Sequence, residues 1–339
     1  MYRHFLLTLL FFLSACDNRA PLTKLEGFVQ GTTYHLTFVA PKGTDTVDVQ
    51  RAVNEEFARI DLALSNYRDD SAIEQFNAQK NTEPTIVDAE LVKLVEIARD
   101  IHKASAGCYD LTIKPLFDLW GFKADVFTPP DDEALAQTLS AVGMDKLETL
   151  AGNRLRKRLP ELRIDVSSIG QGYTVARIAE VLESFGVENY LAEIGGELKV
   201  RGKKPDGKPW RIALEKPLPN QRSLHKIVSF DDGEPMALMA SGTYRHYFDK
   251  DGKRYSHILD ARSGKPIEHD TVSVTILHPD PTLADAWSTA LLCMGAEEGL
   301  AAADAASLAV LFIDQKNDEL VEHYSSAMRE IQGISFPEK

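Results

Sequence analysis

Residues 190–214 read YLAEIGGELKVRGKKPDGKPWRIAL and decide the fold class. Apolar and polar residues alternate in three short runs of this stretch, which is the pattern of half-buried strands. The same pattern continues to about residue 277. The predicted strands of this half are Tyr190 to Ile194, Leu198 to Arg201, Trp210 to Leu214, Lys226 to Phe230 and Thr271 to Leu277, with a hairpin turning at Asp249-Lys250-Asp251-Gly252.

Predicted helices flank this strand-rich region. In the first, Val49 to Leu64, apolar residues recur every three or four positions and form one stripe. Because strands and helices mix without a regular β-α-β alternation, we predict an α+β fold with mixed, largely antiparallel sheets flanked by helices. The other predicted helices are Asp88 to Ser105, Asp131 to Leu139, Tyr173 to Phe185 and Thr282 to Ala306, and the other predicted strands are Thr33 to Val39, Leu155 to Arg158 and Leu162 to Val166.

Composition limits the function classes. The chain has 339 residues, of which 44% are hydrophobic, and its 38 Lys and Arg against 51 Asp and Glu give a formal net charge of −13. This apolar content favours a globular protein over a disordered one. The acidic balance argues against a nucleic-acid partner, since such proteins usually present a basic field.

The N-terminus is typical of a secreted bacterial lipoprotein. Residues 1–15 form a predicted signal peptide, with a basic start and an apolar run that is too short to anchor the chain permanently. Leu13-Ser14-Ala15-Cys16 is similar to a lipobox, in which Cys16 is acylated; the alternative is an ordinary signal peptide with an incidental cysteine. Residues 16–25 are the predicted lipidated cysteine and tether, and residues 26–339 the catalytic domain. Asp17 favours retention on the inner membrane, facing the periplasm.

Two further cysteines, Cys108 and Cys293, remain in the mature chain. They could pair in an oxidising compartment. However, Cys293 lies in the apolar run Ala290 to Met294, where a buried and inert thiol is the favoured interpretation.

A glycine-rich stretch from Ile164 to Gly172 leads from a predicted strand to a predicted helix. A helix N-terminus offers free N–H groups and a positive dipole end, so this turn could bind an anion. The stretch matches neither a Walker loop nor a nucleophile elbow. The simpler interpretation is a strand-to-helix turn capped by Ser167 or Ser168.

Three oxygen-bearing side chains share a face of the last long helix. Asp285, Ser288 and Thr289 are spaced i, i+3 and i+4. One carboxylate with two hydroxyls suits Mg²⁺ when substrate phosphates supply the missing ligands. The alternative is an ordinary first helical turn.

An arginine and a histidine are predicted on neighbouring strands, Arg245 in Ser241 to Arg245 and His257 in Ser256 to Asp260. Because imidazole titrates near neutral pH, His257 is a candidate proton acceptor. A packed, hydrogen-bonded histidine is the alternative.

Taken together and in this order, seven segments resemble the ApbE family of FAD:protein FMN transferases, also called thiamine biosynthesis lipoproteins. The resemblance covers nearly all of residues 27 to 325. The segments are Ser65-Asn66-Tyr67 with Ser71 and Phe76-Asn77; Tyr109 to Thr112 through Trp120-Gly121-Phe122; Asp165 to Ser167 through Gly170 to Tyr173; Gly195-Gly196-Glu197; Ser241 to Arg245; Ser256 to Asp260 with Gly264; and Ala284 to Thr289.

The resemblance implies a single, T-fold-related catalytic unit that uses Mg²⁺ to split the FAD pyrophosphate. FMN would be attached through a phosphoester to a Thr or Ser of a target protein, with release of AMP. His257 would take the proton of the acceptor hydroxyl, and Arg245 would help to hold phosphate. The implied metal ligands are Ser168 (through its carbonyl), Asp285, Ser288 and Thr289, and the implied FAD contacts are Gln30, Tyr67, Cys108, Tyr109, Asp110, Asp165, Gln171 and Leu259.

Three positions depart from the family pattern. Gln171 stands where Lys or Glu is frequent, Gln30 where Met is common and Ala261 where Pro is usual. These changes alter the pocket wall and leave the implied metal ligands in place.

The resemblance also implies the acceptor proteins. The implied acceptors are flavoprotein subunits of sodium-pumping NADH:quinone reductases or Rnf-type complexes.

Two other functions remain open at this stage. Water in place of the acceptor hydroxyl would make the protein an FAD pyrophosphatase that yields FMN and AMP. A periplasmic lipoprotein that only stores FAD is the third hypothesis, but storage requires neither a metal nor a base.

Overall fold

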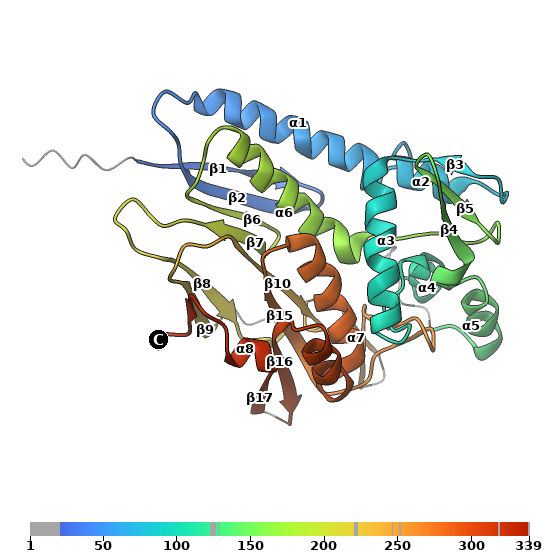
Figure 1. The fold of residues 1–339 in the computed structure, drawn as a ribbon. Coiled ribbons are helices and arrows are strands. Elements are labelled where there is room, and N and C mark those ends of the chain that lie inside the picture. Colours follow the sequence, from blue (N-terminus) through green and yellow to red (C-terminus); the bar gives the residue numbers. More distant parts are fainter. Residues whose placement is uncertain are drawn as a thin grey trace, which may run out of the picture.

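A central sheet of eight strands forms the middle of the molecule (Figure 1). The computed structural model describes residues 21–122, 127, 129–219, 223–245, 247–250, 252–317 and 319–337. The strand order is β1-β2-β6-β7-β10-β15-β16-β17, and every neighbouring pair is antiparallel. The strands are β1 (Leu22–Val29), β2 (Thr32–Val39), β6 (Tyr190–Ile194), β7 (Glu197–Arg201), β10 (Met236–Gly242), β15 (Thr271–His278), β16 (Ala309–Lys316) and β17 (Glu319–Tyr324).

Three long helices cover one face of this sheet, α1 (Thr46–Leu64), α6 (Ser167–Ser184) and α7 (Pro281–Ala305), and a fourth, α3 (Ala89–Ala104), packs beside α7 (Figure 1). The predicted apolar stripe of α1 is buried in the largest core of the protein, together with inward-facing residues of β2, β10 and β16. This arrangement confirms the predicted α+β class with antiparallel sheet.

A second, smaller sheet packs on the opposite face. It consists of β8 (Trp210–Glu215), β9 (Leu224–Phe230) and β18 (Ile334–Ser335). Strand β16 shows how one sequence serves both layers, because Val310 and Phe312 belong to the helix-side core whereas Leu311 and Ile313 belong to the core under the small sheet. This is the period-two alternation of a strand buried on both faces. The short helix α8 (Ser326–Arg329) completes this layer.

The remaining short elements gather at one end of the helices, where a third apolar cluster joins α4, α5 and the β11–β12 hairpin. The hairpin confirms the turn predicted at residues 249–252. The elements are α2 (Ala72–Ala78), β3 (Thr85–Ile86), α4 (Lys114–Trp120), α5 (Asp132–Leu139), β4 (Leu147–Leu150), β5 (Arg154–Lys157), β11 (Tyr247–Lys250), β12 (Lys253–Ser256), β13 (Leu259–Asp260) and β14 (Lys265–Pro266), with 3₁₀ turns at Leu111–Ile113 and Met144–Lys146.

The strand predicted at Leu162 to Val166 is wrong. Its residues alternate between buried and half-buried as a strand would, but no strand pairs with them. Two asparagine side chains take the place of the missing strand: Asn77 Oδ1 accepts from Ile164 N at 2.8 Å, and Asn66 Oδ1 accepts from Val166 N at 2.9 Å. Both amide groups also donate to the Ile164 carbonyl. Side chains, not a neighbouring strand, therefore hold this segment in place.

The predicted cap at Ser167 or Ser168 is also wrong, since both residues already belong to α6 and Val166 precedes the helix without a side-chain cap. Asp165 Oδ1 instead accepts from Ser167 N at 2.8 Å. Gly172 is inside the helix because a neighbour comes close: a Cβ on this residue would lie 2.4 Å from the Pro281 carbonyl oxygen of α7. Gly172 therefore allows two helices to touch and does not mark a turn.

The sheet begins before the predicted end of the tether. β1 starts at Leu22 and pairs with β2 from there, so residues 22–25 belong to the folded domain. The signal peptide and the lipobox cysteine Cys16 lie outside the described residues. Among the described residues, every helix is too short or too polar to cross a bilayer.

Candidate active site

A cavity of about 400 Å³ opens where α6 and α7 meet the ends of the central strands. Its walls come from segments far apart in the sequence, including the first turn of α6, the turn between β6 and β7, and the segment after β12. A concave site of this size is typical for a small-molecule ligand. It brings together twelve of the predicted site residues: Tyr67, Cys108, Tyr109, Asp110, Asp165, Ser168, Gln171, Arg245, His257, Leu259, Asp285 and Thr289.

The contact between α6 and α7 sets the position of Asp285. Gly172 N donates to Asp285 Oδ2 at 2.7 Å, so the carboxylate is fixed against the neighbouring helix. In a regular helix this N–H would bond to the carbonyl of Ser168. The Asp285 carboxylate thus accepts from the N–H group that would otherwise donate to the Ser168 carbonyl. The two segments that are expected to share an ion therefore lie side by side.

Two buried carboxyls, Asp285 and Glu197, lie at the bottom of the cavity. Burial raises the pKa of Asp285 to about 7, against a smaller lowering effect of the Gly172 N–H. Burial and the charge of Asp285 raise the pKa of Glu197 well above its usual range. Among the described residues neither carboxyl forms an ion pair. Without a cation, each therefore raises the energy of the other in its ionised form.

Sequence reasoning missed Glu197 as a site residue. In the sequence, Glu197 stands out only as the last residue of Gly195-Gly196-Glu197, one of the segments that resemble the ApbE family. The structure places it at the start of β7, where both carboxylate oxygens accept from Ala240 N. A usable signal was present, because a charged residue at an inward-facing strand position next to two glycines is unusual unless it is paired or binds a ligand.

The two hydroxyl residues on α7 differ in position. Thr289 lines the cavity, and its Oγ1 lies 3.2 Å from Ser241 Oγ. Ser288 is fully buried and does not line it; its Oγ donates to the Asp285 carbonyl at 2.8 Å and lies 2.7 Å from Ser241 Oγ. Thr289 and Asp285 thus offer oxygen atoms to the cavity, whereas the Ser288 hydroxyl is engaged within the protein.

Tyr109 and Ser168 also line the cavity and contact each other. Ser168 Oγ donates to the phenol oxygen of Tyr109 at 3.1 Å. Burial raises the pKa of Tyr109, so its hydroxyl stays protonated. This contact links the first turn of α6 to the segment that follows α3.

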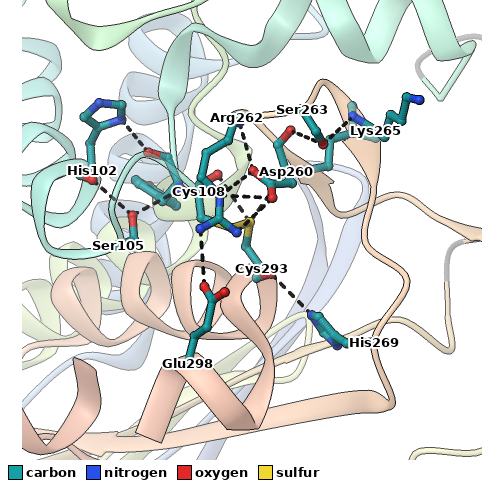
Figure 2. Close-up of a disulfide and its surroundings, with 12 residues drawn as sticks. His102, Ser105, Cys108, Asp260, Arg262, Ser263, Lys265, His269, Cys293 and Glu298 are labelled. Atoms are coloured by element: carbon teal, nitrogen blue, oxygen red, sulfur yellow. Dashed lines mark hydrogen bonds and ion pairs between the residues drawn. A yellow bond between two sulfur atoms is a disulfide. The ribbon is translucent and has the colours of Figure 1, made fainter. Parts of the chain in front are cut away.

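Cys108 and Cys293 form a disulfide, which corrects the interpretation of Cys293 as an inert thiol. Their Cα atoms lie 6.0 Å apart, and both residues line the cavity. Figure 2 shows the disulfide between Arg262, which is paired with Asp260, and His269, whose Nε2 lies 3.3 Å from the Cys293 carbonyl oxygen. The bond ties the loop after α3 to the middle of α7, a contact across 185 positions that local sequence patterns do not encode.

Asp110 and Asp165 present carboxylates that are already engaged. Asp110 accepts from Thr112 N at 2.7 Å and from Met144 N at 3.0 Å, and burial raises its pKa. Asp165 accepts from Ser167 N and Oγ. Both residues shape the wall of the cavity through these bonds.

Gln171 lines the main cavity, whereas Gln30 lies beside it. Gln171 Nε2 donates to the Ile194 carbonyl at 2.6 Å, beneath the turn between β6 and β7. Gly195 in that turn has φ +62°, and a Cβ there would meet Gln171 Nε2 at 2.0 Å. Gln30 does not line the main cavity; it lines a neighbouring one of about 200 Å³ together with Tyr67 and Gln171.

Neither Arg245 nor His257 lies in a strand, contrary to the prediction. Arg245 is in the bend after β10, where Nη2 pairs with Glu215 Oε2 at 2.9 Å. His257 is half-buried between β12 and β13. Both line the main cavity, so the predicted juxtaposition is correct although the secondary structure is not.

Comparison with known proteins places this cavity in context. A model of the ApbE family matches residues 30–312. A relative from Vibrio cholerae named FAD:protein FMN transferase is 38% identical and covers 94% of this chain and 96% of its own length. A solved structure of flavin transferase ApbE from Vibrio cholerae superimposes with a TM-score of 0.84 at 37% identity, over 92% of this chain and 99% of that one. A flavinyl transferase ApbE from Pseudomonas stutzeri, in its apo form, gives a TM-score of 0.84 at 36% identity over 93% and 98% of the two chains.

Proposed function

The chain belongs to the ApbE family and is an FAD:protein FMN transferase, and from this premise we propose that the transfer takes place in the cavity that contains Asp285, Thr289 and His257. FAD is the substrate. A Thr or Ser hydroxyl of an acceptor protein attacks the FMN phosphorus, the new O–P bond joins FMN to the acceptor, and the pyrophosphate O–P bond breaks to release AMP.

The observation that supports the proposal is the pair of buried carboxyls, Asp285 and Glu197, which form no ion pair among the described residues and whose pKa values burial raises. A divalent cation beside Asp285 would relieve their repulsion. Asp285, the Thr289 hydroxyl and the Ser168 carbonyl are hard oxygen donors, which fit Mg²⁺ with phosphate oxygens completing its shell. When bound, Mg²⁺ supplies charge neutralisation on the pyrophosphate. Ser288 would support this set by fixing the Asp285 carbonyl and Ser241.

His257 is the proposed proton acceptor for the incoming hydroxyl. It lines the cavity and is half-buried, so part of the residue is accessible to a substrate. Transfer of the hydroxyl proton to the imidazole would raise the nucleophilicity of the oxygen as the O–P bond forms. Arg245, on the cavity rim, would help to hold a phosphate group.

FAD would lie along the cavity walls. Tyr67 is 79% exposed at the mouth, where an aromatic ring is available to stack on a planar ligand. Tyr109, Asp110, Asp165, Gln171 and Leu259, with the disulfide of Cys108, would form the remaining surface. Gln30 would contribute from the adjoining cavity.

We also propose where the enzyme works. Acylation of Cys16 would anchor the domain to the periplasmic side of the inner membrane, and six residues, 16–21, would separate the acyl chains from β1. The proposed acceptors are flavoprotein subunits of NADH:quinone reductase or Rnf-type complexes, which face the same compartment.

A transfer assay tests the proposal. Purified residues 17–339 are mixed with FAD, Mg²⁺ and a soluble domain of an NADH:quinone reductase flavoprotein subunit. We expect flavin fluorescence that stays on the acceptor domain after denaturation. Free FMN and AMP with unlabelled acceptor would instead identify a pyrophosphatase, and FAD binding without turnover would identify a storage protein.

A further inference from the structure

Two buried asparagines hold the backbone that leads into the first turn of α6. Asn77 Oδ1 accepts from Ile164 N at 2.8 Å, and Asn77 Nδ2 donates to the Ile164 carbonyl at 2.9 Å. Asn66 Oδ1 accepts from Val166 N at 2.9 Å. Both asparagines are buried. Because no described strand pairs with this segment, their amide groups satisfy main-chain groups that would otherwise be buried without a partner.

One carboxylate fixes the orientation of both amide groups. Glu74 Oε1 accepts from Asn66 Nδ2 at 2.8 Å and from Asn77 Nδ2 at 3.0 Å, and Lys114 Nζ lies 3.0 Å from the same oxygen. Burial alone would raise the pKa of Glu74, but the hydrogen bonds from these three residues lower it, so the carboxylate stays ionised. An ionised carboxylate only accepts hydrogen bonds. It therefore selects the orientation in which each amide N–H group faces Glu74 and each amide oxygen faces the main-chain N–H groups.

The segment held in this way carries two of the proposed site residues. Asp165 directly precedes Val166, and the Val166 carbonyl accepts from Ile169 N at 3.1 Å and from Gly170 N at 2.7 Å. These hydrogen bonds close the first turn of α6, which contains Ser168. A displacement of Val166 would therefore displace both the Asp165 carboxylate and the Ser168 carbonyl.

We propose that Asn66 and Asn77, oriented by Glu74, are positioning residues that place the Ser168 carbonyl for Mg²⁺ and thereby set how strongly Mg²⁺ promotes FAD binding. This inference rests on the proposed function, because it takes that carbonyl as a ligand of the ion. Asn77 lines neither the main cavity nor the neighbouring one of about 200 Å³. It can therefore act on a ligand in these cavities only through the backbone that it holds.

The test measures how much Mg²⁺ tightens FAD binding. Fluorescence titration of residues 17–339, without acceptor protein, gives the Kd for FAD in Mg²⁺ and in EDTA. We expect Asn77→Ala to lower the ratio of the EDTA value to the Mg²⁺ value by about tenfold, because loss of a group that supports a metal ligand weakens metal affinity by roughly 10- to 100-fold. Asn66→Ala should lower the ratio in the same way, and it carries the test if Asn77→Ala does not fold. Thermal unfolding shows that each variant is folded at the temperature of the titration.

Ser325→Ala is the matched control. Ser325 is also buried, and its Oγ accepts from Val310 N at 2.9 Å and donates to the Leu308 carbonyl at 2.7 Å. It thus supports a backbone segment as the asparagines do, but it does not line the main cavity. We expect this variant to lower the unfolding temperature and to leave the Kd ratio unchanged. An equal fall of the ratio in Ser325→Ala would assign the effect to general destabilisation and overturn the proposal.

Glu74→Gln with Lys114→Gln separates the hydrogen bonds from the charges. It removes the ion pair but keeps an oxygen at position 74 that can accept from both asparagines, so the Kd ratio should be retained. Loss of the ratio in this folded variant, or an unchanged ratio in folded Asn77→Ala, would overturn the proposal. A ratio of one in the wild type has a different meaning, because it would refute the proposed metal site itself, and this inference with it.

Discussion

Two charge clusters lie in the same half of the molecule and differ in how their charges are compensated. The carboxylate pair, Asp285 and Glu197, has two like charges and forms no ion pair among the described residues, and the charge of Arg245 only partly offsets the raised pKa of Glu197. The lysine pair, Lys114 and Glu74, is neutral as a unit, and two asparagines satisfy its carboxylate. Asp285, Glu197 and Lys114 are buried and Glu74 is half-buried, and the clearest difference between the two clusters is that only the lysine pair compensates its own charge.

This difference indicates which of the two clusters binds a ligand. An uncompensated buried charge raises the free energy of the folded protein unless a ligand of opposite sign arrives. The carboxylate pair therefore favours a cation, and perturbed pKa values of this kind are concentrated at functional sites. The lysine pair needs no counter-ion, because Glu74 compensates the charge of Lys114. Charge balance therefore separates the proposed metal site from this structural ion pair.

Removal of the charge on Asp285 gives the largest expected effect. We expect Asp285→Asn to lower Mg²⁺-dependent FAD turnover by about 10⁴-fold, because metal-ion catalysis contributes several kcal/mol. The same variant should raise the unfolding temperature of the metal-free protein, since the amide is not penalised by burial as a charge is. Turnover is measured by release of AMP, and stability by thermal unfolding in EDTA.

Asp314→Asn is the control for this variant. Asp314 is also buried, but Thr271 Oγ1 donates to it at 2.7 Å and His323 Nε2 lies 3.1 Å away. Its loss should lower stability and leave the chemical step intact. If Asp285→Asn kept full turnover, the metal would have to be elsewhere and the contrast between the two clusters would have no functional meaning.

His257 lines the main cavity together with Asp285 and Glu197. We expect His257→Ala to slow transfer by about 10³-fold, within the usual contribution of a positioned base, with little change in FAD affinity. Single-turnover labelling measures transfer, and fluorescence titration measures binding. His225→Ala is the control, because it removes a histidine of β9 that is paired with Glu322 of β17. An equal loss of FAD affinity would make His257 a binding residue.

The disulfide acts on the carboxylate side, because Cys293 lies on the same helix as Asp285. We expect Cys108→Ser with Cys293→Ser to lower the free energy of unfolding by about 2–4 kcal/mol, the usual effect of closing a long loop. Urea unfolding of residues 17–339 measures it. A reducing agent should destabilise the wild type by the same amount and leave the double variant unaffected. Insensitivity of the wild type would show that the bond is not formed or does not contribute.

The sequence alone predicted what depends on local periodicity. The stripe of α1, the strands β6 and β8 and the hairpin near residue 250 follow from apolar spacing, and the structure confirms them. Leu162 to Val166 has the same alternation, but its partners are the side chains of Asn77 and Asn66, which are 87 and 100 residues away. A pattern of burial does not reveal what satisfies the backbone.

The sequence predicted which segments form the candidate site, but it did not predict how their side chains are arranged. Asp285, Thr289 and His257 were identified from spacing and from the family resemblance, and the structure gathers them in one cavity. Glu197 and Lys114 were not, because their significance depends on which charges surround them after folding. The disulfide and the Gly172–Asp285 contact likewise join distant positions.

The smallest expected effect is a pH dependence that separates the two clusters. Burial raises the pKa of Asp285 to about 7, above roughly 3.9 in an unfolded chain. Between these values the folded state holds a proton that the unfolded state lacks, so this group's stabilisation is lost as pH rises towards 7. Mg²⁺ must displace that proton, and its affinity should therefore weaken about tenfold per pH unit below 7. Thermal shifts with Mg²⁺ from pH 5.5 to 8 measure this trend. Lys114→Met should retain it, Asp285→Asn should abolish it, and a shift independent of pH in the wild type would mean that Asp285 does not meet the ion.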